Sequence, residues 1–467
     1  MPAVALLAYG AALAAGAVVV WRRPHRALYA FIVGLAVHNA VMAGLYWAGV
    51  RGRPLTVIAA WKEVLLAVAL ASVALAAARN RRLPFRPGAV DALALLFAAL
   101  VVIYALIPQD WLDGNADGVT ILYGLRHAGT CVAAYVLGRS IELPPFRRLV
   151  LATAAAVAVL GLVEVYTVSV DDWEDARVPE YFERQLGFEH DGPRGLPENF
   201  VFNTGDETEL LRRLVSTFLS PLGTAYMLVV ALCLWAASPR RWWPLAAIAA
   251  LGLLFTFTRA ALVALAGALV VLAAIQRRWW PALAAAGVLA VGVVWTEVFP
   301  AVAPEASWTQ AELEEQRRRA RELGVPAGEV VSLDEPSIRS HLTALRDGAE
   351  NVLEHPQGFG LGNSGATALR REIPLQAGES TYTELGVETG LLGALVFIAW
   401  NLALFWALAR RGAAAVAAAL AAVLALAVQT DVLGVPWLVY VVWMLSGATL
   451  TACQRRSTRA STSATST

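Results

Sequence analysis

Residues 337–393 read SIRSHLTALRDGAENVLEHPQGFGLGNSGATALRREIPLQAGESTYTELGVETGLLG and join a polar segment to an apolar one. The stretch begins as a polar helix, passes through a glycine-rich turn and enters an apolar run that continues to residue 408. Three acids, Glu379, Glu384 and Glu388, lie at this junction. Because an apolar run of about 20 residues can cross a bilayer as a helix, we interpret the stretch as the place where a large water-exposed loop returns to a membrane.

The whole chain has the composition of a membrane protein. Of its 467 residues, 58% are hydrophobic and 16% are charged, whereas about a quarter of the residues of a soluble domain are charged. The apolar runs do not alternate polar and apolar residues as the strands of a membrane barrel do. The sequence therefore predicts an all-α, polytopic integral membrane protein with about 13 transmembrane helices and two sizeable extracytoplasmic loops. The apolar runs are 3–20, 27–47, 55–78, 89–107, 118–138, 148–169, 214–236, 243–257, 260–275, 280–299, 385–408, 412–430 and 436–452.

Every second connection between the apolar runs is short and rich in arginine. By the positive-inside rule, the short arginine-rich connections face the cytoplasm. This predicts a multi-pass protein of the cytoplasmic (inner) membrane with its N-terminus outside and its C-terminus inside. The predicted parts are N-terminal transmembrane helices (1–170), a first extracytoplasmic loop (171–213), central transmembrane helices (214–299), a large helical extracytoplasmic loop (300–382), C-terminal transmembrane helices (383–453) and a disordered cytoplasmic tail (454–467).

Cysteine usage gives no sign of a disulfide framework or a metal site. Cys131, Cys233 and Cys453 are far apart, odd in number and placed in apolar runs, which is not the spacing of metal ligands. We predict no metal, no cofactor and no nucleic-acid partner.

Ionisable residues inside apolar runs are few and share a depth. They are costly in a bilayer and usually face a cavity. Lys62, Arg126 and Glu164 all fall near the outer ends of their runs, at the same level as Arg213 and Arg259. We therefore predict one outward-facing polar cavity that binds an anion, since guanidinium groups fit phosphate oxygens. The alternative is structural: Lys62 pairs with Glu63 or Glu164, and Arg213 and Arg259 reach lipid phosphates.

The large second loop is predicted to contain two helices. The charged run AELEEQRRRARELG (311–324) is typical of a solvated surface helix. The next helix starts near Pro336 and stops at Glu354, because the residue before Pro356 avoids the α region. Arg339 and Arg346 are seven residues apart and share its polar face.

Four short motifs resemble those of one family of membrane enzymes. RLVSTFLSP (213–221), TFTRAAL (256–262), HPQGFGLG (355–362) and YTELGVETGLLG (382–393) occur in this order, with the large loop between the second and third. They resemble motifs of O-antigen ligases and the related O-antigen polymerases. These are integral membrane glycosyltransferases that move a glycan from a polyprenyl-diphosphate carrier to an acceptor hydroxyl outside the membrane.

The resemblance implies roles for several residues. It implies that Arg213 and Arg259 hold the diphosphate. Where the ligases have a His-Asn pair that assists the acceptor hydroxyl, this chain has Glu379 followed by Ser380. We interpret Glu379 as the general base; alternatively, it binds sugar hydroxyls or pairs with an arginine of the second loop helix, and His341 and His355 are rival bases. The residues assigned to substrate binding are Lys62, Arg126, Arg339, Arg346 and Tyr382.

The leading interpretation is an inverting, metal-independent transfer that builds cell-surface polysaccharide, because arginines can neutralise a diphosphate and no D-x-D motif occurs in the outer loops. The expected partners are a polyprenyl-diphosphate-linked glycan, a glycan, lipid or protein acceptor, and membrane lipids. A transporter or flippase for a lipid-linked or anionic substrate is the alternative, although we find no internal repeat of the kind transporters contain. A non-catalytic envelope receptor is a third interpretation. Ligase and polymerase share these features.

Overall fold

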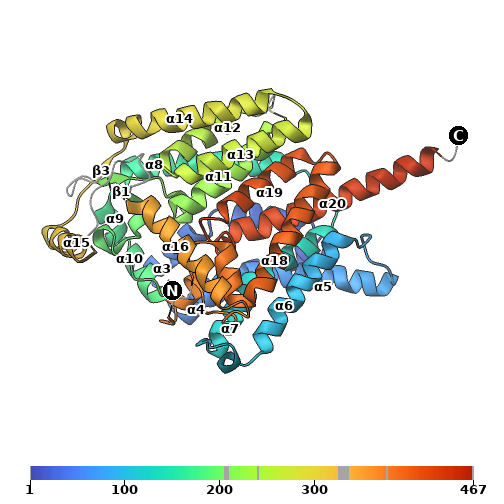
Figure 1. The fold of residues 1–467 in the computed structure, drawn as a ribbon, viewed down its shortest axis with the longest axis horizontal. Helices are drawn as coiled ribbons and strands as arrows, with labels where there is room; N and C mark the ends of the chain where they lie inside the picture. Colours follow the sequence, from blue (N-terminus) through green and yellow to red (C-terminus); the bar gives the residue numbers. More distant parts are fainter. Residues whose placement is uncertain (1, 204–209, 239–240, 324–335, 375–376, 465–467) are drawn as a thin grey trace.

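A computed structural model describes residues 2–203, 210–238, 241–323, 336–374 and 377–464, and almost all of its regular structure is helical (Figure 1). The N-terminal part holds α1 (Pro2–Arg22), α2 (Arg26–Gly34), α3 (His38–Trp47), α4 (Arg53–Ala59), α5 (Trp61–Asn80), α6 (Ala89–Leu106), η1 (Gln109–Trp111), α7 (Gly118–Ser140) and α8 (Arg147–Thr167). The first loop holds α9 (Val170–Asp175), α10 (Val178–Glu180), η2 (Tyr181–Leu186), η3 (Pro193–Gly195), η4 (Glu198–Phe200), β1 (Val201–Asn203), β2 (Leu210–Arg212) and η5 (Ser216–Phe218).

Four helices follow and lie side by side at one end of the molecule (Figure 1). These are α11 (Pro221–Ala236), α12 (Trp243–Phe255), α13 (Arg259–Gln276) and α14 (Trp280–Val302). The second loop holds β3 (Glu305–Ala306), α15 (Gln310–Leu323), α16 (Pro336–Glu354) and α17 (Gly365–Leu369). The chain then continues through α18 (Thr381–Arg410), α19 (Ala414–Leu426) and α20 (Pro436–Ala464).

The helices confirm an all-α membrane protein. Within the described ranges, eight helices are long and apolar enough to cross a bilayer, and a ninth span results if α2 and α3 are taken together. These two helices meet at an angle of 58°, so the single helix predicted over 27–47 is wrong in detail. The helix α19 has 13 residues, or roughly 20 Å, and most of its side chains are buried against other helices.

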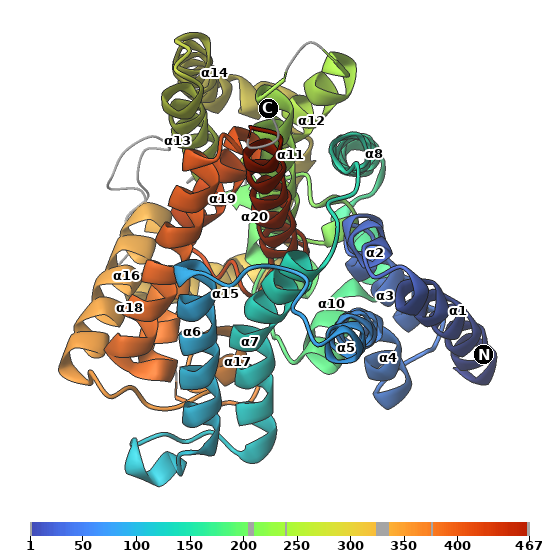
Figure 2. The ribbon, with the colours of Figure 1, turned by 90° about the vertical axis from the view of Figure 1, so that its right-hand side faces the viewer.

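The most extensive contact between two helices in the described ranges is that of α7 with α20, which Figure 2 labels one below the other in the middle of the view. Two glycines permit the close approach: a side chain at Gly138 would overlap the backbone of Met444, and one at Gly447 would overlap the backbone of Tyr135. Small residues at such crossings let helix backbones meet in membranes. The pair matters for the candidate site described below, because α7 supplies four of its polar side chains and α20 also contributes lining residues.

The two outer loops are joined to each other. Strands β1, β2 and β3 form a small antiparallel sheet in which Leu210 of the first loop pairs with Ala306 of the second. Arg194 adds a second connection, because its guanidinium lies 2.8 Å from Asp171 and 3.0 Å from Glu312. The sequence had not predicted these strands, which are only two or three residues long.

A break in α18 explains the glycine-rich HPQGFGLG motif. Thr389 and Gly390 leave helical geometry, and Gly390 has a φ of +67°, which favours glycine. The motif fills the break: the N–H of Phe359 donates to the carbonyl of Val387 at 2.7 Å, and the N–H of Leu391 donates to the carbonyl of Pro356 at 2.9 Å. The motif therefore fixes the N-terminal half of α18, which carries the acids at the membrane junction.

The second-loop helix α16 has the predicted boundaries, from Pro336 to Glu354. Where the second loop returns to the membrane, Ser380 is the N-cap residue of α18, and Glu379 before it has a φ of +66°. For a residue other than glycine this left-handed backbone costs about 1–2 kcal/mol. Such strain persists only where the surrounding structure holds the residue in place.

Candidate active site

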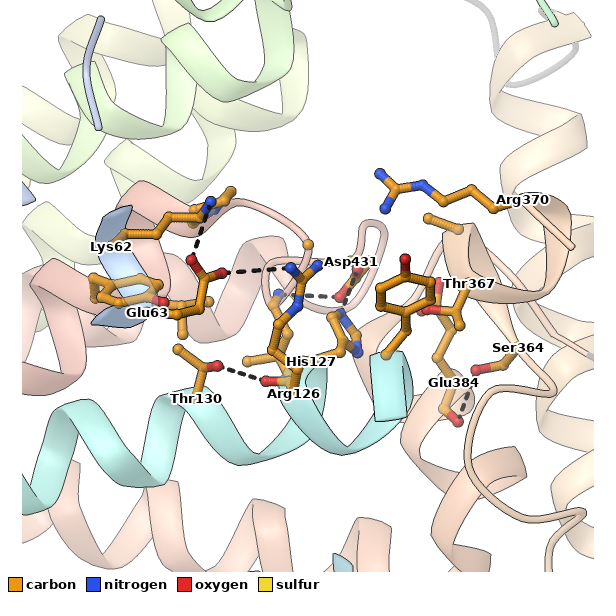
Figure 3. Close-up of a pocket in the computed structure, with 17 residues that line it drawn as sticks. Lys62, Glu63, Arg126, His127, Thr130, Ser364, Thr367, Arg370, Glu384 and Asp431 are labelled. Carbon is orange, nitrogen blue, oxygen red and sulfur yellow. Dashed lines mark hydrogen bonds and ion pairs between the residues drawn. The ribbon is translucent and has the colours of Figure 1, made fainter. Parts of the chain in front are cut away.

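Side chains from five separate parts of the chain line one pocket that encloses about 750 Å³, including its opening to solvent. Figure 3 shows it among α5, α7, the segment around α17, the start of α18 and the connection between α19 and α20. The polar lining residues used below are Lys62, Glu63, Tyr123, Arg126, His127, Ser364, Thr367, Arg370, Glu384 and Asp431.

Three cations, Lys62, Arg126 and Arg370, line this pocket, and Figure 3 shows Lys62 and Arg370 at opposite sides of it with Arg126 between them. Glu63 contacts two of them: its carboxylate lies 3.6 Å from Lys62 Nζ and 3.4 Å from the guanidinium of Arg126. Lys62 is buried and also donates a hydrogen bond to the carbonyl of Ala59 at 2.8 Å. One carboxylate is thus shared between two cations.

Arg370 is placed differently, at the end of α17. Its guanidinium lies 4.5 Å from the ring centre of Phe188 in the first loop, and among the described residues no ion pair to it is found. Partial burial and the nearby Arg126 cation both lower the pKa of Arg370. Like charges that face one another across a pocket favour an anion between them.

A histidine and an aspartate form the wall between the cations and α18. Nε2 of His127 lies 2.9 Å from Oδ2 of Asp431. The other aspartate oxygen accepts a hydrogen bond from the N–H of Leu433 at 3.0 Å. Nδ1 of His127 is buried and has no hydrogen-bond partner among the described residues.

Two acids of α18 reach this region from one helix face, four residues apart. Glu384 lines the pocket and is 4% exposed. A side chain at Gly365, which has a φ of +53°, would overlap the Glu384 carboxylate. Glu388 is buried behind it and accepts a hydrogen bond from the N–H of Gly362 at 2.9 Å. The glycine-rich motif therefore also holds the second acid, Glu388, by a hydrogen bond.

The structure divides the predicted cavity into two places. Lys62 and Arg126 line the pocket, but Arg213 and Arg259 are not among its lining residues. Glu164, predicted to belong with them, instead forms an ion pair with Arg212 at 2.7 Å. The single cavity shared by all four cations is therefore not found among the described residues.

Arg213 and Arg259 form a second cationic group at the turn between α12 and α13. Arg213 donates to the carbonyl of Thr256 at 2.9 Å and to the hydroxyl of Thr258 at 3.1 Å. Burial and the Arg259 cation lower the pKa of Arg213 to about 10, so the group stays charged at neutral pH. The Arg259 guanidinium lies 5.9 Å from the ring centre of Phe202.

Glu379, the predicted base, lies at the membrane junction outside the pocket lining. Its Oε2 is 2.5 Å from Nδ1 of His341 on α16, and both side chains are nearly half exposed. The sequence suggested Arg339 or Arg346 as the partner of Glu379, and the structure shows His341 in contact with it. The hydrogen bond brings together the predicted base and one of its two rivals.

The other predicted binding residues are not in the pocket. The Arg346 guanidinium lies 2.7 Å from Glu350 on the same helix and is largely exposed. The hydroxyl of Tyr382 donates to the carbonyl of Leu424 at 2.9 Å, which ties α18 to α19. Arg339 lies on α16, and its side chain is outside the described part of the chain.

Sequence reasoning did not assign His127, Arg370, Glu384 or Asp431 to the site. His127 is adjacent to Arg126 in an apolar run, and this position could have identified it as a site residue. Asp431 is a lone acid between two apolar runs that carry no acid of their own. Arg370, in contrast, sits in a loop with nothing in its spacing to single it out.

Comparison with known proteins agrees with the motifs. Residues 244–398 match the family model described as O-antigen ligase. The match includes Arg259, Arg370, Glu379 and Glu384 but not the residues of α5, α7 and the connection before α20 that complete the pocket. No curated protein matches the chain. The matched part of the chain is therefore similar to O-antigen ligases, and the described ranges contain helices long and apolar enough to cross a membrane.

Proposed function

We propose that the protein transfers a glycan from a polyprenyl-diphosphate carrier to an acceptor hydroxyl on the outer side of the cytoplasmic membrane, as a ligase or polymerase of cell-surface polysaccharide. The observation that carries this proposal is the convergence of Lys62, Arg126 and Arg370 on one pocket. They come from α5, α7 and the end of α17, far apart in the sequence.

The charge balance in the pocket supports an anionic donor. The Glu63 carboxylate contacts both Lys62 and Arg126, and the Asp431 carboxylate contacts His127. Arg370 has an aromatic ring beside it and, among the described residues, no carboxylate. Two arginines that can each present a planar fork are suited to phosphate oxygens. A diphosphate leaving group fits this arrangement, because its charge grows as the bond to the sugar breaks.

Arg213 and Arg259 contribute to donor binding in this proposal. The hydrogen bonds of Arg213 to the turn at Thr256 and Thr258 hold its guanidinium in one orientation. The ring of Phe202 supports Arg259. The two motifs in which these arginines lie are the first two that resemble the family. We assign the pair to the part of the donor that extends beyond the pocket.

The pair of Glu379 and His341 belongs to the acceptor side in this proposal. Both side chains are exposed to solvent at the membrane junction, where an acceptor glycan arrives. The carboxylate and the imidazole offer hydrogen-bond acceptors and donors for sugar hydroxyls.

The proposal includes the orientation of the chain in the membrane. Both outer loops and the N-terminus lie outside the membrane, and the C-terminus lies inside. The transfer inverts the anomeric carbon and uses arginines where other enzymes use a metal.

Deletion of the gene, followed by mass spectrometry of the envelope glycan, tests the proposal. A ligase predicts full-length glycan that stays on its lipid carrier, and a polymerase predicts glycan of a single repeat. Complementation with the wild-type gene should restore the glycan, and complementation with Arg259→Ala or Arg213→Ala should not. An unchanged envelope glycan in the deletion strain would contradict both forms of the proposal.

A further inference from the structure

The pocket has an acid that none of its cations engages. Of the three carboxylates lining it, Glu63 contacts Lys62 and Arg126, and Asp431 contacts His127. Glu384 is the third, and among the described residues no side chain donates a hydrogen bond to its carboxylate. It is 4% exposed and lies on the side of the pocket where Ser364 and Thr367 also lie (Figure 3).

The surroundings of Glu384 hold it in this position. Its carboxylate packs against Gly365, where any side chain would overlap it. The hydroxyl of Ser364 donates to its backbone carbonyl at 3.3 Å. The N–H of Glu379, whose φ is +66°, lies near the carboxylate. The strained backbone at Glu379 and the absence of a side chain at Gly365 thus both help to hold the Glu384 carboxylate in position.

Transfer to a hydroxyl needs a proton acceptor across the reaction centre from the leaving group. With a diphosphate held by Lys62, Arg126 and Arg370, the pocket carboxylate for which the described residues show no ion pair is that of Glu384. Glu379 is less suited, because His341 holds its carboxylate at 2.5 Å and it does not line the pocket.

We propose that Glu384 is the catalytic base, an inference that rests on the proposed function. The acceptor oxygen forms a bond to the anomeric carbon while the bond from that carbon to the diphosphate oxygen breaks. The bonding electrons leave with the polyprenyl diphosphate, whose charge the three cations stabilise. The proton of the acceptor hydroxyl passes to the Glu384 carboxylate. The hydrogen-bonded pair of His127 and Asp431 lines the same pocket.

Membranes of the deletion strain provide a test, since they contain the natural donor and acceptor. Purified protein is added, and the disappearance of lipid-linked glycan is followed by mass spectrometry. Glu384→Gln keeps the shape of the side chain and should lower the transfer rate at least about 100-fold, the usual contribution of a general base. Glu384→Asp keeps the carboxylate and should retain part of the rate.

Two matched variants and a binding measurement separate chemistry from folding. Glu388→Gln changes the buried acid four residues further along α18, and Glu379→Gln changes the exposed one. Both should transfer at least ten times faster than Glu384→Gln. Binding of polyprenyl diphosphate to protein in lipid nanodiscs should differ less than about twofold between Glu384→Gln and wild type.

Glu384→Gln transfer within about threefold of wild type would overturn the assignment of the base and leave the proposed function intact. Loss of polyprenyl-diphosphate binding in Glu384→Gln would also overturn it, because the residue would then be structural. Failure of the wild-type protein to consume lipid-linked glycan in these membranes would instead contradict the proposed function itself.

Discussion

Nε2 of His127 on α7 lies 2.9 Å from Oδ2 of Asp431, which is 304 residues further along the chain. The pair joins the helix that carries Arg126 to the connection that precedes α20, and so it sets the width of the pocket. Both side chains are mostly buried. A buried polar pair of this kind is costly to break, because the remaining partner loses its hydrogen bond.

We expect Asp431→Ala to lower the free energy of unfolding by about 1–3 kcal/mol, the cost of leaving a buried donor without its acceptor. Thermal unfolding in detergent should show a lower Tm. Glu198→Ala is the control, since its partner His190 lies 3.3 Å away but the Glu198 side chain is 59% exposed; its effect should be small. Equal Tm values for the two variants would refute a structural role for the buried pair.

Arg212 and Arg213 are neighbours with different roles. Arg212→Ala removes the partner of the buried Glu164 carboxylate and should destabilise the protein by about 3–5 kcal/mol. Arg213→Ala removes two hydrogen bonds at the turn before α13 and should change the Tm much less, while abolishing transfer. Thermal unfolding and glycan transfer are measured on both variants. If Arg213→Ala is as unstable as Arg212→Ala, then Arg213 is structural rather than part of the donor site.

Gly390 lies at a close contact between the broken helix and the glycine-rich motif. A side chain there would come within 2.7 Å of the carbonyl oxygen of Pro356, and its φ of +67° disfavours other residues. Gly390→Ala should cost more than about 1 kcal/mol of stability and lower the transfer rate through the shift of Glu384. Gly287→Ala, with nothing within 4 Å of the added carbon, should be neutral or slightly stabilising. Similar Tm values for the two variants would contradict this role of the motif.

We expect the contribution of Asp117, at the start of α7, to the stability of the protein to depend on pH. Hydrogen bonds from Thr120, followed by the contact with Arg371, lower the pKa of Asp117 to about 2. A lowered pKa in the folded state gives stability that is present above the unfolded pKa of about 4 and is lost as the pH falls through about 2. The Tm difference between wild type and Asp117→Asn should be constant from about pH 7 to 5 and shrink below about pH 4. A difference that grows as the pH falls would contradict the assignment.

The all-α membrane class followed from the sequence, because long apolar runs have few alternatives in a membrane. The predicted number of about 13 spans is not confirmed, since the described ranges give eight, or nine if α2 and α3 form one span. The boundaries of α16 followed from Pro336 and Pro356, whose rings restrict the backbone locally. The bend between α2 and α3 did not follow, because the run from 27 to 47 contains no proline to mark it. The short strands β1 to β3 were equally invisible, since pairing between two distant loops leaves no periodic pattern in segments of two or three residues.

The candidate site was predicted only in part, for a physical reason. Depth along a helix can be counted from the sequence, and the two residues predicted at one level in this way, Lys62 and Arg126, line the same pocket. The direction in which a side chain points around the bundle depends on packing, and so Arg213 and Arg259 could not be separated from them. Arg370 and Asp431 reach the pocket from connections between helices, where the position in space is set by contacts far away in the chain.

The most direct test of the account is the binding of polyprenyl diphosphate to protein in lipid nanodiscs, compared between Arg370→Ala and Arg371→Ala. Arg370 lines the pocket, whereas its neighbour Arg371 pairs with Asp117 at 2.6 Å and does not line it. Loss of a charged hydrogen bond costs about 1.5–3 kcal/mol, so Arg370→Ala should weaken binding by about 10- to 100-fold. Arg371→Ala should bind within about twofold of wild type. Equal binding by Arg370→Ala and wild type would contradict the claim that this pocket holds the diphosphate.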